Sequence, residues 1–426
     1  MKKRYFNGIS INVILLGIIS FLNDMSSEMI TPILPMFISS LGGTGLVIGL
    51  VGGIRDSISS LLKVFSGYLS DKTGKRKVFI FSGYLTSSIF KIVLALAQTW
   101  QQILIFIGLE RIGKGIRTAA IESIIADSMP KQRGRGFGIH RAFDTTGAVI
   151  GSCIVFFLFW YLNFNFRSII LIAALFAFVS LVPLHFIKEK KSKPQNITLK
   201  LSLKNLPKSL KLFIFIASIF ALANFSYMFF ILKTLNLFEG KYAIGITLLL
   251  YILFNLFYAL FAVPVGNLSD KIGRKNILIA GFLLFSITTL GFALFNSLSM
   301  FVSLFILYGI TYALIEGTQR AFVSDLSPEH LRATALGTFH TIIGLIALPS
   351  SLIAGLLWQF NPISTFIYGS SLSLLSAVLF LNYKHRFRNA QGFYNLNKST
   401  KRDIKIKYLR FGSLSDRQIE AFKKNC

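Results

Sequence analysis

Apolar runs of about 20 residues recur from one end of the chain to the other, and short polar turns separate them. A helix of that length crosses the hydrocarbon core of a bilayer, where every backbone polar group must find its partner within the chain. Only 15% of the residues are charged, whereas a soluble protein has about 25%. The sequence therefore predicts an all-α integral membrane protein with much of its apolar surface facing lipid.

Two of the polar turns are near copies of each other. Gly67–Lys77 reads GYLSDKTGKRK, and Gly266–Asn276, in the second half of the chain, reads GNLSDKIGRKN. Asp127 and Asp325 repeat at nearly the same separation. Apolar runs need no such loop chemistry, so a repeated polar turn predicts a duplicated unit.

At these turns the chain resembles the major facilitator superfamily of secondary transporters, whose loop between helices 2 and 3 reads G-x-x-x-D-[RK]-x-G-[RK]-[RK]. The named places are filled twice, by Gly67, Asp71, Lys72, Gly74, Lys75 and Arg76 and by Gly266, Asp270, Lys271, Gly273, Arg274 and Lys275. The resemblance implies twelve transmembrane helices in two pseudo-symmetric six-helix halves. It also implies a central cavity that opens alternately to each side of the membrane.

The apolar runs give the expected helices and the domain organisation. Six helices are predicted before the middle of the chain, near Ile11–Ser39, Leu46–Leu69, Val78–Ala97, Ile103–Asp127, Gly136–Leu162 and Arg167–Ile187. Six more are predicted near Leu212–Leu235, Ala243–Leu268, Ile277–Phe295, Met300–Val323, Ala333–Trp358 and Ile363–Tyr383. The predicted domains are an N-terminal half at 1–187, a cytoplasmic linker at 188–211, a C-terminal half at 212–383 and a basic cytoplasmic tail at 384–426.

A net charge of +28 is the kind of balance that suggests a nucleic-acid partner. The bases, however, collect in alternate turns and at the termini, which places them on one side of the membrane and both termini in the cytoplasm. We therefore expect no nucleic acid, and a tail attracted to anionic lipid head groups. The high content of Phe, Ile, Lys and Asn is typical of AT-rich bacterial genomes, so we expect the protein in a bacterial cytoplasmic membrane. We also expect it to be a monomer.

The repeated turns carry acids and bases that can pair and cap neighbouring helices. By resemblance, Asp71 with Lys75 or Arg76 joins Asp127 in a charge cluster that latches the halves together on the cytoplasmic side. A second cluster would consist of Asp270, Arg274 and Asp325, and the turns themselves would need Gly67 and Gly266. The alternative is that these residues only set topology and cap helices.

The first half also carries charge inside its apolar runs, where a charge costs roughly 2.5–3.5 kcal/mol and therefore faces an interior. These residues are Asp24, Glu28, Arg55, Asp56, Lys63, Lys91, Glu110, Arg111, Lys114, Arg117, Glu122, His140, Arg141 and Asp144. The second half carries far fewer. The acids nearly balance the bases, so one interpretation is that paired charges only hold the bundle together. The other is that some of them face the cavity and act on a solute.

Four bases are the candidates for binding the negative groups of a substrate: Arg55, Arg111, Lys114 and Arg117. Guanidinium groups can hold a carboxylate or phosphate by two hydrogen bonds, and lysine supplies a compact charge. The competing interpretation is that Glu110 neutralises Lys114 and that Glu122 serves Arg117. If the bases are free to bind a solute, the favoured substrate is anionic, such as a polycarboxylate, a siderophore or an organic phosphate.

Three acids are the candidates for carrying a coupling proton. Asp24 and Glu28 lie four residues apart and so share one face of the first helix. Asp56 is the third candidate, should neither of these carry the proton. Burial raises the pKa of a carboxylate and a nearby base lowers it, so a site that exchanges its base for substrate can load and release a proton. A proton-driven transporter is therefore predicted.

The main alternative is a multidrug/proton antiporter. Efflux pumps of the resembled family carry G-x-x-x-G-P-x-x-G-G in helix 5, whereas Gly147-x-x-x-Gly151 is followed here by Ser152. Lys114 and Arg117 also add positive charge where the family has an uncharged residue. A channel or a sensor explains the duplicated turns less well. No catalytic constellation, cofactor loop or metal-ligand cluster appears in a plausible context, so no enzyme, cofactor or metal is expected.

Overall fold

The computed structural model describes residues 5–6, 8–130, 132–189, 206–327 and 331–383. The side chain of Asp71, the predicted tail at 384–426 and most of the predicted linker lie outside the described residues. The chain forms two units, 1–381 and 382–426. Everything below concerns the first of them.

The described elements are a short antiparallel strand pair and a series of helices. Strands β1 (Tyr5–Phe6) and β2 (Ile9–Ser10) pair at the N-terminus. The first set of helices is α1 (Ile11–Ile30), α2 (Leu34–Ser40), α3 (Gly45–Thr73), α4 (Arg76–Ala95), α5 (Trp100–Ser128), α6 (Arg133–Trp160), α7 (Phe166–Val179) and α8 (Leu181–Leu184). The second set is α9 (Lys208–Ala223), α10 (Met228–Leu235), α11 (Gly240–Ile272), α12 (Arg274–Leu294), α13 (Leu298–Leu326), α14 (Arg332–Phe360) and α15 (Pro362–Leu381).

Eleven stretches of the described chain are long and apolar enough to cross a membrane. Helix α5 is the twelfth crossing, since its 29 residues at about 1.5 Å per residue exceed the thickness of a hydrocarbon core. Its middle carries Glu110, Arg111, Lys114 and Arg117, which is too much charge for a simple apolar span. The twelve predicted helices are therefore present, and the most polar of them must be shielded by its neighbours.

Two crossings are interrupted toward the end that lies away from the repeated turns. The first helix stops at Ile30, and α2 starts at Leu34 with Pro35 in its opening turn, a position that proline favours. The break between α9 and α10, at 224–227, has no proline and was not predicted. The two breaks touch, because the Tyr227 hydroxyl donates to the Thr31 carbonyl oxygen at 3.0 Å.

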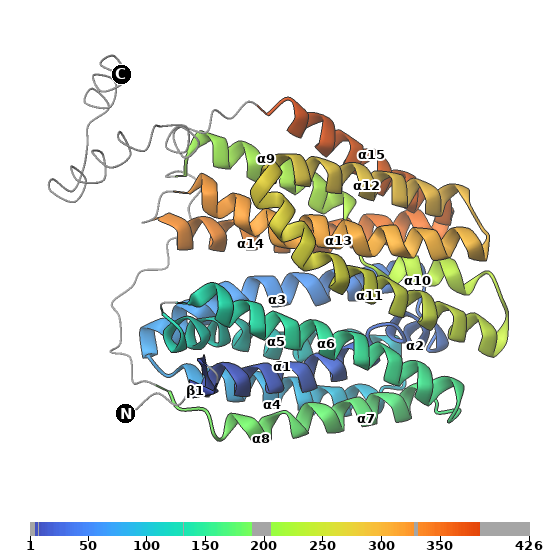
Figure 1. The fold of residues 1–426 in the computed structure, drawn as a ribbon. Helices are drawn as coiled ribbons and strands as arrows, with labels where there is room; N and C mark the ends of the chain where they lie inside the picture. The colour runs from blue at the N-terminus through green and yellow to red at the C-terminus, as the bar shows by residue number, and fades with distance from the viewer. Residues whose placement is uncertain (1–4, 7, 131, 190–205, 328–330, 384–426) are drawn as a thin grey trace, which may run out of the picture. The chain divides into compact units, whose positions relative to one another are not determined.

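Helices of the two halves lie against each other along two seams. Figure 1 shows α3 and α14 running side by side, and α6 and α11 likewise. Glycines permit the first seam: a Cβ at Gly49 would lie 2.2 Å from the Ser351 carbonyl oxygen, and one at Gly53 would lie 2.9 Å from the Leu348 Cα. Small residues four apart on one helix face allow such close contact, and α14 is the helix that packs there.

The halves meet at the end of the helices that lies away from the repeated turns. There Gln359 donates to the Thr44 hydroxyl at 3.0 Å, and Lys241 donates to the Trp160 carbonyl oxygen at 2.7 Å. At the opposite end, the ion pairs that involve the described side chains of the repeated turns stay within one half. Hydrogen bonds of the described residues thus join the halves at the end away from the repeated turns.

Candidate functional site

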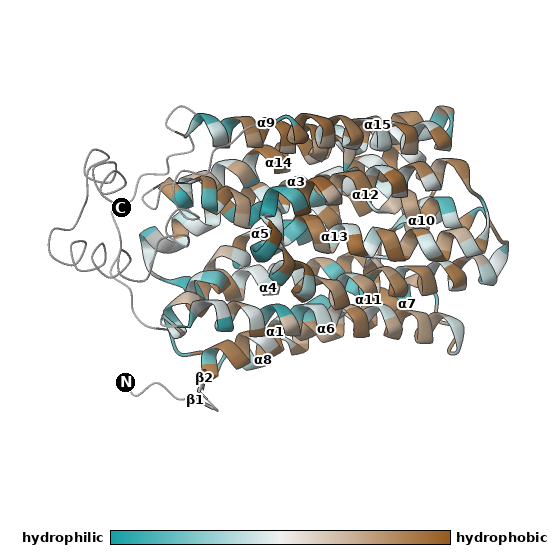
Figure 2. Ribbon diagram, turned by 45° about the horizontal axis from the view of Figure 1, so that its top comes forward, coloured by the Kyte–Doolittle hydropathy of each residue, from teal (hydrophilic) through white to brown (hydrophobic). Residues whose placement is uncertain are grey.

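A cavity of about 520 Å³ lies between the halves, bounded by α1, α3, α5 and α6 on one side and by α9, α11, α13 and α14 on the other. A second cavity of about 630 Å³ shares Asp24, Lys114 and Arg141 with it and extends along the helices to Lys63 and Glu122. Ligand sites in proteins have about 300–1,000 Å³. Figure 2 shows hydrophilic stretches of α3 and α5 among otherwise hydrophobic helices at this place.

All three candidates for proton coupling line this cavity. Glu28 accepts a hydrogen bond from the Tyr251 hydroxyl at 2.6 Å, so its carboxylate is already held by the second half. In the part of the chain that the structure describes, the carboxylates of Asp24 and Asp56 have neither a hydrogen bond nor an ion pair. Both are therefore available to a proton or a solute.

Two of the four candidate bases line the same cavity. Arg55 is 7% exposed and is held by two neighbours, donating to the Thr31 hydroxyl at 2.8 Å and to the Tyr227 hydroxyl. Its guanidinium also lies 5.0 Å from the centre of the Tyr227 ring. Lys114 borders both cavities, and among the described residues its ammonium group has no partner.

The other two candidate bases are engaged inside the first half. Arg117 borders only the second cavity, donates to the Ser87 hydroxyl at 2.7 Å and lies 4.3 Å from the centre of the Tyr84 ring. Arg111 does not reach either large cavity: its Nε lies 2.8 Å from Glu110 Oε2, beside a void of about 10 Å³. The structure thus separates the four bases into two that face the central space and two that support it.

The competing pairing of these bases differs from the observed one. Glu110 pairs with Arg111 rather than with Lys114, and Glu122 pairs with Lys63 at 2.7 Å rather than with Arg117. The reason is direction around the helix: Lys114 points between the halves, whereas Glu110 points into the first bundle. Within the described chain, the ammonium group of Lys114 is consequently left without a partner.

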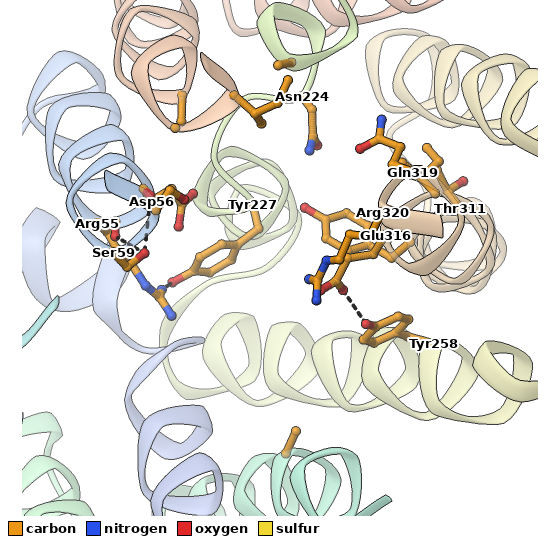
Figure 3. Close-up of a pocket in the computed structure, with 18 of the residues that line it drawn as sticks. Arg55, Asp56, Ser59, Asn224, Tyr227, Tyr258, Thr311, Glu316, Gln319 and Arg320 are labelled. Atoms are coloured by element: carbon orange, nitrogen blue, oxygen red, sulfur yellow. Dashed lines mark hydrogen bonds and ion pairs between the residues drawn. The ribbon is translucent and has the colours of Figure 1, made fainter. Parts of the chain in front are cut away.

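Sequence reasoning missed a set of contacts that cross the cavity. Arg141 of α6 lies 3.4 Å from Glu316 of α13, which also pairs with Arg320 at 2.5 Å. The Tyr258 hydroxyl accepts from Arg141 and donates to Glu316. Figure 3 shows three of these residues and their neighbours, Tyr258 on α11 and Glu316 and Arg320 on α13, opposite Arg55 on α3. The sequence holds one signal for these contacts: Tyr251 and Tyr258 lie seven residues apart, so both hydroxyl groups lie on the same face of α11.

The repeated turns bring several of the latch candidates together. Arg76 pairs with Asp127 at 2.5 Å, and Arg274 pairs with Asp325 at 2.7 Å and with Asp270 at 3.4 Å. Each of these pairs lies within one half, so in this conformation they do not join the halves. The side chain of Asp71 lies outside the described residues.

Glycine has a different use at different places in the repeated turns. Gly74 and Gly273 have φ angles of 67° and 93°, which other residues adopt with strain, so these two positions end their helices sharply. A Cβ at Gly67 would lie 3.0 Å from the Ala119 Cβ of α5, whereas one at Gly266 would meet nothing within 4 Å. Lys75 immediately precedes α4. Among the described residues, no group of three or more His, Cys, Asp or Glu side chains could hold a metal ion.

Comparison with known proteins gives three likenesses. The profile of the Major Facilitator Superfamily matches residues 16–252 and 214–410. An uncharacterised MFS-type transporter of Methanocaldococcus jannaschii is 56% identical over 377 residues, which cover 88% of this chain and 95% of that relative. The quinolone resistance protein NorA of Staphylococcus aureus is 26% identical over 132 residues, 31% of this chain and 34% of that protein.

Among solved structures, a mutant of the nucleoside transporter NupG has a TM-score of 0.76 at 16% identity, covering 88% of this chain and 100% of that chain. Identity at that level shows the fold alone. The predicted fold class, twelve helices in two pseudo-symmetric halves, is confirmed by this likeness together with the family match.

Proposed function

Because the chain belongs to the Major Facilitator Superfamily and is a multi-pass membrane transporter, we propose that it is a proton-coupled secondary active transporter of a small organic solute with an anionic group. The two halves would expose the cavity alternately to each side of the membrane. The observation that carries this proposal is a cavity between the halves that holds both a free base, Lys114, and free acids, Asp24 and Asp56. Solutes bind at such a place in transporters built from repeats.

Lys114 is the proposed first contact of the anionic group, and Arg55 supports it from α3. Both border the cavity, and Arg55 is already oriented by Thr31 and Tyr227. Arg117 and Arg111 act indirectly in this proposal, because their neighbours in the first half already hold them. The solute class, a polycarboxylate, a siderophore or an organic phosphate, rests on the sequence pattern.

Asp24 is the proposed carrier of the coupling proton. Its carboxylate borders the same space as Lys114 and has no partner among the described residues, whereas Glu28 is held by Tyr251. Asp24 and Lys114 border the same space, so a solute anion that binds Lys114 would offset a positive charge that favours the ionised form of a nearby carboxylate. Solute and proton would then bind together.

The repeated turns are proposed to latch the halves at the cytoplasmic end in the other conformation. Asp71 with Lys75 or Arg76 and Asp127 would form one cluster, and Asp270, Arg274 and Asp325 the other. The proposed domains remain the halves at 1–187 and 212–383, the linker at 188–211 and the tail at 384–426. Helix α9, however, already begins at Lys208, inside the proposed linker.

We place the protein, as a monomer, in a cytoplasmic membrane with both termini inside, because the bases of the turns collect on that side. The composition suggests a bacterial source, while the relative with 56% identity is archaeal. The tail would contact anionic lipid head groups.

Counterflow in proteoliposomes tests the proposal. Vesicles loaded with citrate, glycerol 3-phosphate or an amino acid should accelerate uptake of the same labelled solute, and an inward proton gradient should drive its accumulation. Lys114→Gln should raise the half-saturating concentration at least tenfold, because a charge-assisted hydrogen bond is worth about 1.5–3 kcal/mol. Failure of every solute with an anionic group would overturn the proposal.

The second candidate is a multidrug/proton antiporter. It is favoured by the partial likeness to NorA and by the aromatic residues that line the cavity on the side of the second half. Accelerated exchange of a lipophilic cationic dye, with no anion active, would establish this function in place of the first.

A further inference from the structure

The two walls of the 520 Å³ cavity differ in chemistry. Of the described residues that line it, every aromatic side chain belongs to the second half, including Phe254, Tyr258 and Tyr312. The wall of the first half has no aromatic side chain and carries most of the charge. The rings are contiguous: the Phe254 centroid lies 6.4 Å from that of Tyr258 and 5.4 Å from that of Tyr312.

Most charges at this cavity are already satisfied by protein. Arg55 donates to Tyr227 and Thr31, Glu28 accepts from Tyr251, and Arg141, Glu316 and Arg320 pair with one another. Asp144 lies 3.4 Å from His140. We therefore assign these paired groups to the shape of the site and not to direct binding of a ligand.

Three charged groups that border the cavity remain without a partner in the described chain: Lys114, Asp24 and Asp56. A purely anionic solute at Lys114 would bring further negative charge beside two carboxylates in a space of low dielectric. A solute that also carries a cationic group can neutralise one of the two carboxylates. Protonation of Asp24, the proposed coupling step, then leaves the site balanced.

Asp56 is the better acceptor for the cationic group. It is exposed to the cavity on α3, and Figure 3 shows it facing the space in front of Tyr227. Aromatic faces attract cations as well as apolar groups, so an ammonium at Asp56 would also gain from the neighbouring rings. Asp24, which borders both cavities, is left to the proton.

We infer that the cavity takes an amphoteric solute, with a carboxylate or phosphate at Lys114, an amine at Asp56 and a flat apolar or aromatic body against the rings of α11 and α13. This inference rests on the proposed function and narrows its substrate class. Polycarboxylates and simple organic phosphates, which lack the cationic group, become poor ligands.

Matched ligands test it on the full-length protein in lipid nanodiscs. Equilibrium binding is measured for phenylalanine, 3-phenylpropionate and phenethylamine, and for tryptophan, indole-3-propionate and tryptamine. Within each set the zwitterion should bind at least tenfold more tightly than the anion and the amine. Glycine, which keeps both charges but lacks the ring, should bind at least tenfold more weakly than phenylalanine.

Variants assign the contacts. Asp56→Asn should remove the advantage of the zwitterion over the anion, and Asp56→Glu should restore part of it. Lys114→Gln should remove the advantage over the amine. Lys208→Gln, an exposed position at the start of α9 that does not border the cavity, should leave all affinities unchanged, and thermal unfolding of each variant shows that it is folded.

Equal or tighter binding of the anions, or no binding by any of the six aromatic ligands, overturns the inference. If citrate or glycerol 3-phosphate still exchanges in counterflow, the proposed function survives that result. Preference for the amines in both sets would overturn the inference and the proposed function together.

Discussion

At the scale of single residues, the charges within the first half serve two purposes that their burial separates. Glu110 is 2% exposed and pairs with Arg111, and Lys91 is 1% exposed and donates to Ser26 at 2.8 Å and Ser27 at 3.0 Å. Lys91 therefore joins α4 to α1, whereas the pair of Glu110 and Arg111 lies within α5. Lys114, on the same helix as Glu110, faces the cavity without a partner among the described residues.

Glu110→Gln should therefore destabilise the protein by about 3–5 kcal/mol, because it leaves the buried charges of Arg111 and Lys91 without their acid. Lys114→Gln, one helical turn away, should unfold at nearly the wild-type temperature. Thermal unfolding in one detergent measures both. Equal loss of stability in the two variants would mean that Lys114 is also structural.

Asp24→Asn should abolish proton-driven accumulation and keep counterflow, because the amide cannot carry a proton yet still fits the space. Glu28→Gln is the matched control one turn away, and it should keep coupling because Tyr251 already occupies that carboxylate. Both activities are measured in the same proteoliposome preparation. Full accumulation by Asp24→Asn would remove Asp24 from the coupling step.

At the scale of helices, glycine contacts within a half and between halves have different consequences. Gly147 and Gly151 of α6 pack on α1, where a Cβ would lie 2.4 Å from the Phe21 carbonyl oxygen and 2.3 Å from that of Met25. Gly49 of α3 packs equally closely, but on α14 of the other half. Close backbone approach through small residues is how helices associate in lipid.

Adding one methyl group at each place gives a sharp comparison. Gly151→Ala forces α1 and α6 apart inside one bundle and should destabilise the protein by about 1–3 kcal/mol. Gly49→Ala should instead weaken the seam between the halves and open the end away from the repeated turns, with a smaller loss of stability. The readouts are thermal unfolding and labelling of a cysteine at Ala148, which borders the cavity.

An impermeant thiol reagent is applied from each side of the membrane, in a background that lacks Cys153 and Cys426. Gly49→Ala should increase labelling from the side that is closed in the parent protein. Unchanged labelling, with a stability loss like that of Gly151→Ala, would show that the α3–α14 contact is a rigid interface.

At the scale of the whole molecule, hydrogen bonds of the described residues join the halves at the end away from the repeated turns. The ion pairs described for the repeated turns, Arg76–Asp127, Arg274–Asp270 and Arg274–Asp325, each lie within one half. This is the arrangement expected when the cavity opens toward those turns. The opposite state must bring the turns closer together, and there the loop acids would act between the halves.

Asp71→Asn should shift the resting population toward opening at the repeated turns. A charge-assisted hydrogen bond worth about 1.5–3 kcal/mol supports a shift of tenfold or more in that equilibrium. Labelling of the Ala148→Cys protein should rise from the cytoplasmic side and fall from the other. Asp270→Asn, its counterpart in the second half, should change labelling in the same direction.

Unaltered labelling from both sides, in folded Asp71→Asn protein, would leave this acid with a role in topology only. Lys208→Gln, at the start of α9, is the control for loss of a charge at the helix ends near the repeated turns, and it should change neither signal.

The sequence by itself determined the class of protein, the helices and their duplication. Apolar length, repeated turns and the distribution of bases are local or periodic properties. A bilayer admits only helices and closed barrels, and apolar runs of about 20 residues fit helices. The break between α1 and α2 has a local signal, the proline in the first turn of α2. The break at 224–227 had no such signal, because it is stabilised by contacts with the other half.

Only the tertiary structure decided which charges face the cavity. Spacing along α5 puts Glu110, Lys114 and Arg117 on one face, yet Glu110 pairs with Arg111, Arg117 is held by Ser87 and Tyr84, and Lys114 alone reaches the central space unpaired. A helix surface tells which side chains are neighbours, but the helices packed around it decide which of them find partners. The aromatic wall of the second half arises in the same way, from residues on several helices that no single stretch of sequence brings together.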